Sequence, residues 1–216
     1  MAKKEKSLHD RVYDNFKRDI KEHTIEIIKD DDVYKHISFG EPGTRCMRVE
    51  ILTSPDHLFY YGDMGSYCFT RNKYMLGFFA NDRGINPHYW MEKIVASSEP
   101  PMELSQKEIE KNVLEEVESY VESYHDSLSK KKRGLLTKTI FDDVMDSVSF
   151  NGDSDYWLSR AISDVMDYSN SEYPELTFED FYEYGCKEYT TRYLWCCFAL
   201  NHVANYYFKN IYKEEV

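Results

Sequence analysis

The stretch L58-F-Y-Y-G-D-M-G-S-Y-C-F69 decides the fold class, because two short strand-like segments flank a turn rich in glycine. Residues 58–61 and 67–69 are rich in aromatic side chains, which favour strands. The intervening residues 62–65, Gly-Asp-Met-Gly, are typical of a hairpin turn, since glycine tolerates positive φ. The pattern predicts an antiparallel pair of strands.

The alternation of apolar and polar residues extends toward the N-terminus, over 33–39 and again over 47–51. A period of two is the strand signature, and Glu-Pro-Gly at 41–43 is turn chemistry. The sequence therefore predicts an antiparallel meander of about four strands. An amphipathic helix over residues 7–29 is expected before it, and two short helices near 74–79 and 89–96 are expected after it.

Pro100-Pro101 marks the one plausible internal boundary, and the pattern beyond it is helical. A capping box at Ser105 and Glu108 predicts the start of a helix. Lys-Lys-Lys-Arg-Gly at 130–134 predicts its end, because cations and glycine favour helix C-termini. Further helices are expected near 137–149, near 154–168 and from Thr177 onward. We therefore expect an α+β protein, with a helix-and-sheet region (1–98) packed as one body with an acidic helical region (99–216).

The net charge of −12 is concentrated in the middle of the chain. Residues 1–98 carry 15 basic and 15 acidic side chains, residues 99–183 carry 8 and 21, and residues 184–216 carry 4 and 3. Such a segment repels nucleic-acid phosphate, because affinity for nucleic acid depends on Lys and Arg. It would steer toward a basic surface. No direct binding to duplex nucleic acid is expected.

Cysteine usage and the absence of known motifs narrow the function further. The chain has five cysteines, no CxxC pair, a charged start (MAKKEKSLHD) and no apolar run of membrane-spanning length. These features predict reduced thiols and a cytoplasmic protein without membrane contact. No Walker, GxGxxG, HExxH or GxSxG motif is present. No cofactor, metal or catalytic residue is predicted, and an enzyme is the less favoured interpretation.

A candidate ligand site consists of His36, His57 and Asp63. Two histidines and a carboxylate suit metal binding or general acid–base chemistry. The alternation of strand side chains counts against a shared site, because only one face of a strand can point toward it. The alternative is that Asp63 belongs only to a hairpin turn.

The acidic region offers a second kind of candidate site, a surface for a basic protein partner. Tyrosine suits such surfaces because its ring packs while its hydroxyl stays hydrated. The predicted partner-binding residues are Glu110, Glu115, Glu118, Glu122, Asp153, Asp155, Glu172 and Glu175, with Tyr120, Tyr124 and Tyr173 as aromatic anchors.

Several stretches of the chain resemble an uncharacterised family of proteins encoded by tailed bacteriophages and prophages. They are H23-T-I-E-I-I-K-D-D-D-V-Y-K-H36, F39-G-E-P-G-T, T53-S-P-D-H-L, Y61-G-D-M-G-S-Y-C-F-T-R71, I85-N-P-H-Y-W-M-E-K-I94 and K187-E-Y-T-T-R-Y-L-W-C-C-F-A-L200. The chain departs from the family at Ser54, where tryptophan is common, and at Asp56, where glycine is common, so no role is transferred to that loop. The resemblance implies a phage context and no catalytic residue.

These observations favour a phage accessory protein that acts by binding another protein. Carboxylates spaced along helices can imitate phosphates, and host defence complexes such as CRISPR effectors contain basic nucleic-acid channels. Counter-defence, in the manner of an anti-CRISPR inhibitor, is the leading hypothesis. One alternative is a small phage enzyme or ligand-binding protein that uses His36, His57 and Asp63. Another is a non-catalytic virion or regulatory component.

Overall fold

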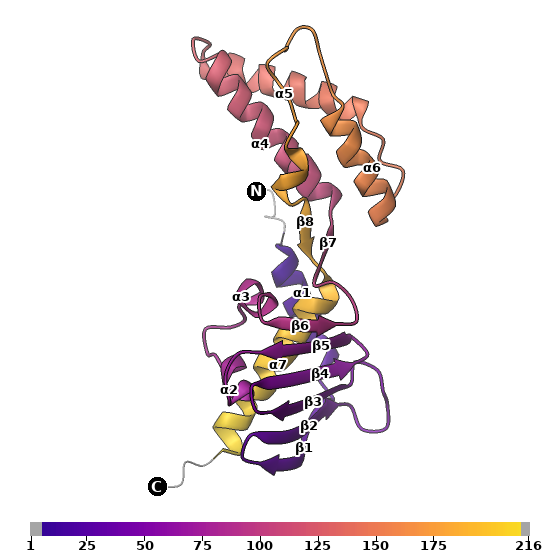
Figure 1. Cartoon of the computed structure of the whole chain (residues 1–216), viewed down its shortest axis with the longest axis vertical. Coiled ribbons are helices and arrows are strands. Elements are labelled where there is room, and N and C mark those ends of the chain that lie inside the picture. Colours follow the sequence, from indigo (N-terminus) through magenta and orange to yellow (C-terminus); the bar gives the residue numbers. More distant parts are fainter. Residues whose placement is uncertain (1–5, 213–216) are drawn as a thin grey trace. The chain divides into compact units, whose positions relative to one another are not determined.

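The computed structural model describes residues 6–212 and confirms the α+β class. Its contacts divide the chain into two compact units. The first unit comprises the chain up to Pro101 together with the segment from Tyr189 onward, and the second comprises Met102–Glu188. Figure 1 shows the sheet of the first unit and the helices of the second.

The first unit is built on a six-stranded antiparallel meander in which every strand pairs with its neighbour in sequence. The predicted four strands form its centre, with one further strand at each edge. The strands are β1 (Thr24–Asp31), β2 (Tyr34–Gly40), β3 (Val49–Ser54), β4 (His57–Gly62), β5 (Gly65–Thr70) and β6 (Ile94–Ser97).

The two edge strands correct the predicted helix boundaries. The predicted helix over 7–29 is wrong beyond Asp19, where α1 (Leu8–Asp19) ends. Residues 24–27 instead pair with β2, where Ile25 and Ile27 lie opposite core residues. The predicted helix over 89–96 is likewise divided between α3 (Pro87–Met91) and β6. In both segments, pairing with the neighbouring strand half-buries Ile25, Ile27 and Ile94, which favours the strand over a short helix.

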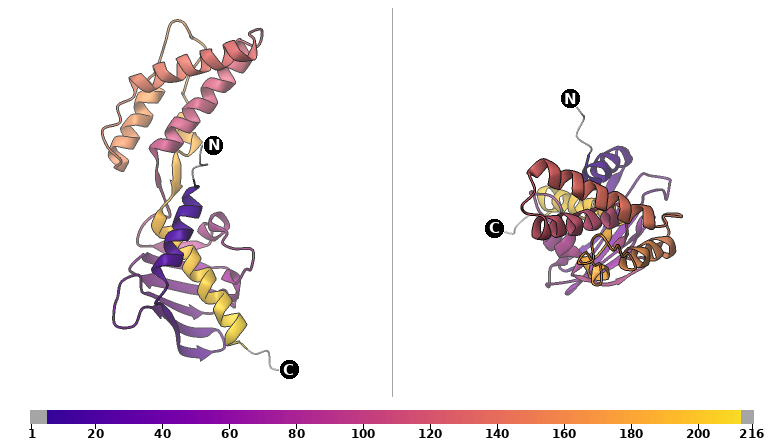
Figure 2. Two further views of the ribbon diagram at one scale, coloured as in Figure 1. Left: turned by 180° about the vertical axis from the view of Figure 1, so that it is seen from behind. Right: turned by 90° about the horizontal axis from the view of Figure 1, so that it is seen from above.

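Helices α1 and α7 (Thr191–Asn210) lie side by side across one face of the sheet, as Figure 2 shows, and α2 (Met75–Phe79) packs beside them. The inward-facing strand residues Ile37, Ile51 and Phe69 are completely buried beneath them. Helix α7 is apolar on most of its surface because sheet, α1 and α2 all contact it. The indole of Trp195 donates to Asp19 Oδ2 at 3.2 Å and joins α7 to α1.

The predicted last helix exists, but its predicted start at Thr177 is wrong. A 3-10 turn (Phe181–Tyr184) is followed by Gly185 with φ 59°, a left-handed conformation that ends a helix and suits glycine. Strand β8 (Lys187–Tyr189) follows, and α7 begins only after Thr190, whose hydroxyl accepts from Tyr193 N at 3.1 Å.

The second unit contains β7 (Met102–Leu104), α4 (Gln106–Tyr124), α5 (Lys130–Ser147) and α6 (Asp155–Met166), with β8 paired to β7. Ser105 precedes α4, but its hydroxyl donates to Glu188 at 2.8 Å, so the predicted capping box does not form. The predicted helix end at 130–134 is wrong, because these residues open α5. Ile109, Val113, Ile140 and Val144 are completely buried where α4 and α5 pack together.

The second unit is an insertion in the first. Thr190 N donates to Pro101 O at 3.0 Å, so the chain leaves and re-enters the first unit at adjacent residues. The predicted region 99–216 therefore does not form one unit: residues 189–212 belong with the sheet. The reason is that the apolar surface of α7 is buried against the sheet core. Among residues 6–212, no helix is long and apolar enough to cross a membrane.

The five cysteines are free thiols in very different surroundings, which gives a first prediction. Cys46 is exposed, whereas Cys196 and Cys197 are completely buried and burial raises the pKa of both thiols. Because the thiolate is the reactive form, brief native alkylation should modify Cys46 while Cys196 and Cys197 react only after denaturation. Peptide mass spectrometry measures the outcome. Rapid native modification of Cys197 would contradict the burial of α7.

Candidate functional site

The predicted site of His36, His57 and Asp63 does not assemble. His57 begins β4 and its Nδ1 lies 3.1 Å from Pro55 O, whereas Asp63 follows the last residue of β4 and accepts from Met47 N at 3.1 Å. The strand between them spans about 20 Å. Among residues 6–212, no group of three or more His, Cys, Asp or Glu side chains is arranged to hold a metal ion.

His36 has a different partner, which the sequence did not single out. Its Nε2 lies 2.9 Å from Glu50 Oε2, and Ser38 Oγ donates to Glu50 Oε1 at 2.9 Å. Arg48 Nη1 donates to Ser38 Oγ at 3.1 Å. Both His36 and Ser38 are hydrogen-bonded to the carboxylate, so the arrangement lacks the hydroxyl-to-imidazole contact of an activated nucleophile. We interpret it as a polar network that orders the open face of the sheet.

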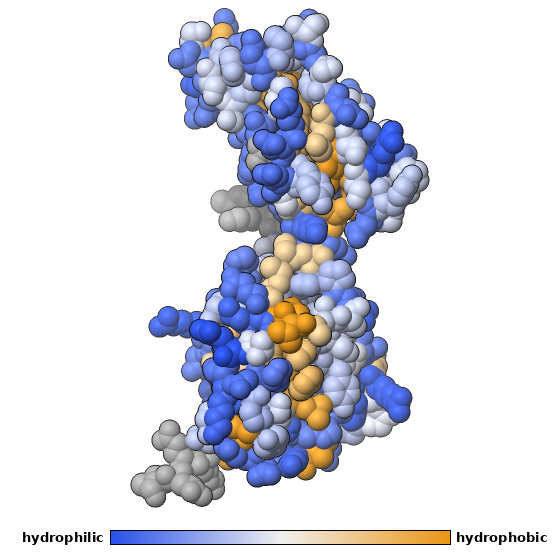
Figure 3. All heavy atoms as spheres, in the orientation of Figure 1, coloured by the Kyte–Doolittle hydropathy of each residue, from blue (hydrophilic) through white to orange (hydrophobic). Residues whose placement is uncertain are grey.

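Apolar side chains lie beside this network on the face of the sheet that the helices leave uncovered. Leu52, Phe59 and Cys68 form one cross-strand row with His36. The side chain of Phe59 remains 44% exposed. Figure 3 shows an apolar band running across this face of the sheet.

The predicted acidic surface lies on the second unit. Residues 102–188 carry 21 acidic and 9 basic side chains, so this unit holds the entire net charge of −12, and the first unit is neutral. Glu115, Glu118 and Glu122 are exposed on the solvent face of α4. Glu110 is half-buried and accepts from Gln106 Nε2 at 2.7 Å, which makes it less available to a partner.

The other four predicted acids, Asp153, Asp155, Glu172 and Glu175, are exposed as well. Asp155 lies in the first turn of α6, where the positive end of the helix dipole stabilises a carboxylate. This local role accounts for Asp155 without a partner. Glu172 and Glu175 lie in the loop after α6, where their carboxylates face solvent.

The three predicted aromatic anchors come together in the second unit. The ring of Tyr120 stacks on Tyr124 with 5.0 Å between centroids and meets Tyr173 edge-on at 6.3 Å. Tyr120 is buried and supports the cluster, whereas Tyr124 is 58% exposed. The carboxylate of Glu175 is close enough to contribute to the raised pKa of Tyr120, after the larger effect of burial. The cluster therefore presents one exposed ring beside acidic groups.

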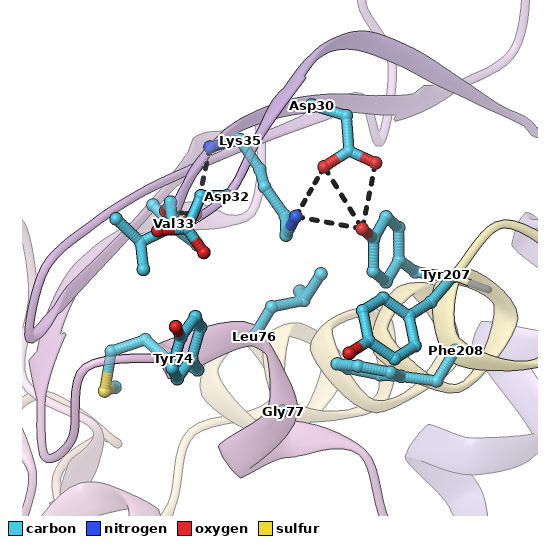
Figure 4. Close-up of a pocket in the computed structure, with 12 residues that line it drawn as sticks. Asp30, Asp32, Val33, Lys35, Tyr74, Leu76, Gly77, Tyr207 and Phe208 are labelled. Carbon is cyan, nitrogen blue, oxygen red and sulfur yellow. Dashed lines mark hydrogen bonds and ion pairs between the residues drawn. The ribbon is translucent and has the colours of Figure 1, made fainter. Parts of the chain in front are cut away.

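The first unit contains a cavity that the sequence did not predict (Figure 4). It has a volume of about 480 Å³ and opens between the β1–β2 turn, β3, the start of α2 and the end of α7. The aromatic and aliphatic walls include Val33, Tyr74, Leu76, Tyr207 and Phe208. No local signal identifies it, because its walls come from residues more than 170 positions apart in the sequence.

A partly exposed ion pair forms the polar wall of this cavity. The ammonium group of Lys35 donates to Asp30 Oδ1 at 2.5 Å and to the hydroxyl of Tyr207 at 2.9 Å, and that hydroxyl donates to Asp30. Burial alone would lower the pKa of Lys35, but the hydrogen bonds to Asp30 and Tyr207 outweigh it, and the pKa is raised. The cavity therefore combines apolar and aromatic walls with one charged end.

Comparison of the chain with protein-family models, with curated proteins and with solved structures finds no match.

Proposed function

We propose that this protein is a phage accessory protein that acts by protein–protein binding, with its inserted acidic unit as the binding element. Its target would be a basic, nucleic-acid-binding surface of a host complex, and its role counter-defence of the anti-CRISPR kind. The observation that carries the proposal is the division of charge: the inserted unit holds all of the net charge of −12 and the unit that carries it is neutral.

The geometry of α4 supports this role. Glu115, Glu118 and Glu122 follow one another at three- and four-residue spacing, so their carboxylates form a row with a rise of about 5 Å per step. Lys111 approaches Glu115 at 3.8 Å, but Glu118 and Glu122 have no cation within ion-pair distance among the described residues. Like charges at i and i+4 destabilise a helix slightly, so a row of this kind costs stability that a basic partner would restore.

The exposed ring of Tyr124 adds an apolar contact beside the acidic row. Aromatic residues are enriched among the few interface positions that dominate binding energy. Tyr124 packs on Tyr120 and is held in place without covering its outer face. A partner with arginines could stack on that face while it pairs with the neighbouring carboxylates.

The test compares two charge-neutralised groups with a matched control in the full-length chain. One variant replaces Glu110, Glu115, Glu118 and Glu122 with Gln; the second replaces Asp153 and Asp155 with Asn, and Glu172 and Glu175 with Gln. The control replaces four exposed acids of the neutral unit, Glu22, Glu26, Asp31 and Glu41, with the corresponding amides. All three remove the same charge, so only the location differs.

Host proteins captured by the parent chain from infected cells serve as the binding partner. Exposed complementary charges mainly accelerate association. Each variant of the acidic unit should therefore associate about tenfold more slowly at low salt, with little change in its dissociation rate. The control should bind like the parent. Surface plasmon resonance at several salt concentrations and a phage-protection assay measure both effects. If both acidic-unit variants bind and protect as the parent does, the acidic surface is only a solvated face and the proposal fails.

A further inference from the structure

The cavity of the first unit has the size and lining of a small-molecule site. Its volume of about 480 Å³ lies within the range of roughly 300–1,000 Å³ found for ligand pockets. Figure 4 shows Tyr74 on one side, Tyr207 and Phe208 on the other, and Leu76 between them. The ion pair of Lys35 and Asp30 lies above this space. The walls are thus apolar and the polar groups gather at one end.

The charges that line the cavity determine whether it favours an anionic or a cationic ligand. Lys35 is compensated by Asp30, to which it is directly bonded. Asp32 also lines the cavity and is exposed, so the lining carries a net charge of −1. Its backbone has φ 48°, in the left-handed region, at the turn between β1 and β2. Asp32 forms no ion pair with another described residue, although Lys73 is near enough to interact with it electrostatically. The net charge of the lining would repel an anion and attract a cation.

The aromatic walls favour a cation as well, because the face of an aromatic ring is electronegative. Two lysines of the chain already use this property against rings that line the cavity. The ammonium group of Lys35 lies 4.7 Å from the centroid of Tyr207, and that of Lys73 lies 5.1 Å from the centroid of Tyr74. Lys73 does not line the cavity, and its ammonium group is fully exposed. Rings on both walls therefore already contact a positive charge, Tyr207 with a lysine that lines the cavity and Tyr74 with a lysine that does not.

We propose that this cavity binds a small organic cation: a protonated amine carried on an aromatic or aliphatic body. The ammonium group would pair with the carboxylate of Asp32. The apolar body would lie between Tyr74 and Phe208, above Leu76. This site is independent of the acidic unit and of its proposed partner, because every lining residue belongs to the first unit.

The test uses three probes with one body and different charge: phenethylamine, 2-phenylethanol and phenylacetate. Each is titrated into the isotope-labelled full-length chain and followed by NMR. Fragments of this size bind weakly, so dissociation constants in the millimolar range are expected. The amine should bind about tenfold more tightly than the alcohol, and the carboxylate more weakly than either. Shifts should concentrate on Val33 and Leu76.

Two pairs of variants locate the charge and ring effects. Asp32→Asn keeps the left-handed turn, which asparagine tolerates, and should weaken amine binding about fivefold while leaving alcohol binding unchanged. Its matched control is Asp56→Asn, because Asp56 is exposed, has φ 66° and does not line the cavity. Tyr74→Leu should weaken amine binding because it removes the ring, whereas Tyr74→Phe should preserve it.

Equal affinity for the amine and the alcohol would overturn the proposal, as would amine binding that is indifferent to both Asp32→Asn and Tyr74→Leu. Shifts confined to other parts of the chain would overturn it too. Parent-like amine binding by Asp56→Asn and Tyr74→Phe, together with loss in their counterparts, would support it.

Discussion

A chain in which a short Gly-Ser linker replaces residues 102–188 is expected to fold into the intact first unit. The two ends to be joined are already adjacent, since Thr190 N donates to Pro101 O at 3.0 Å. The core beneath the sheet is supplied entirely by residues on either side of the insertion. Closing a short loop costs little entropy compared with the buried apolar surface that remains.

Removing α7 instead of the second unit should have the opposite effect on folding. A chain that ends at Glu188 lacks α7 and leaves Ile37, Ile51 and Phe69 without their cover, so its first unit should not fold cooperatively. Circular dichroism, dispersion of the NMR amide signals and urea titration distinguish the two shortened chains. A folded truncation, or an unfolded linker chain, would contradict the insertion topology. The linker chain also lacks the acidic unit and should not bind its partner.

A large loss of stability is expected from Phe69→Ala in β5. Phe69 is completely buried, with its ring edge-on to Phe79 at 5.1 Å between centroids. Truncation of a fully buried phenylalanine costs about 3–5 kcal/mol of unfolding free energy, because it removes apolar burial and leaves a cavity. That is a large part of the ~5–15 kcal/mol that typically stabilises a domain. The first unit should therefore be only marginally stable at 37 °C.

The control is Phe59→Ala in the adjacent strand, on the opposite face of the sheet. Phe59 is 44% exposed, so its loss should cost less than about 1 kcal/mol. Urea unfolding followed by tryptophan fluorescence and near-UV circular dichroism measures both variants. Trp90 and Trp195 report on the first unit and Trp157 on the second, so only the transition of the first unit should shift. Similar losses for the two variants would contradict the assigned register.

The local sequence pattern was sufficient to predict a helix or strand where one face of the element is buried and the other is exposed. The alternation of residues 33–39 and 47–51 and the aromatic content of 58–61 and 67–69 correctly predicted the four central strands. A helix was also correctly predicted to begin after Ser105, where α4 begins. The prediction failed where a short apolar pattern fits both the helix period and the strand period. Ile20 and Ile27 are seven residues apart, as on a helix, but pairing with β2 makes residues 24–31 an edge strand.

The location of the negative charge could be predicted from the sequence, because exposed carboxylates need no tertiary context to carry charge. The role of Tyr120, Tyr124 and Tyr173 as anchors stays a prediction. Which side chains come into contact could not be predicted from the sequence pattern. The separation of His57 from Asp63 follows from the length of β4, and the pairing of His36 with Glu50 follows from strand register. The cavity requires Lys35 and Tyr207, 172 residues apart, to share a hydrogen bond. Only burial of α7 against the sheet brings them together, since that long-range packing leaves no local periodicity in the sequence.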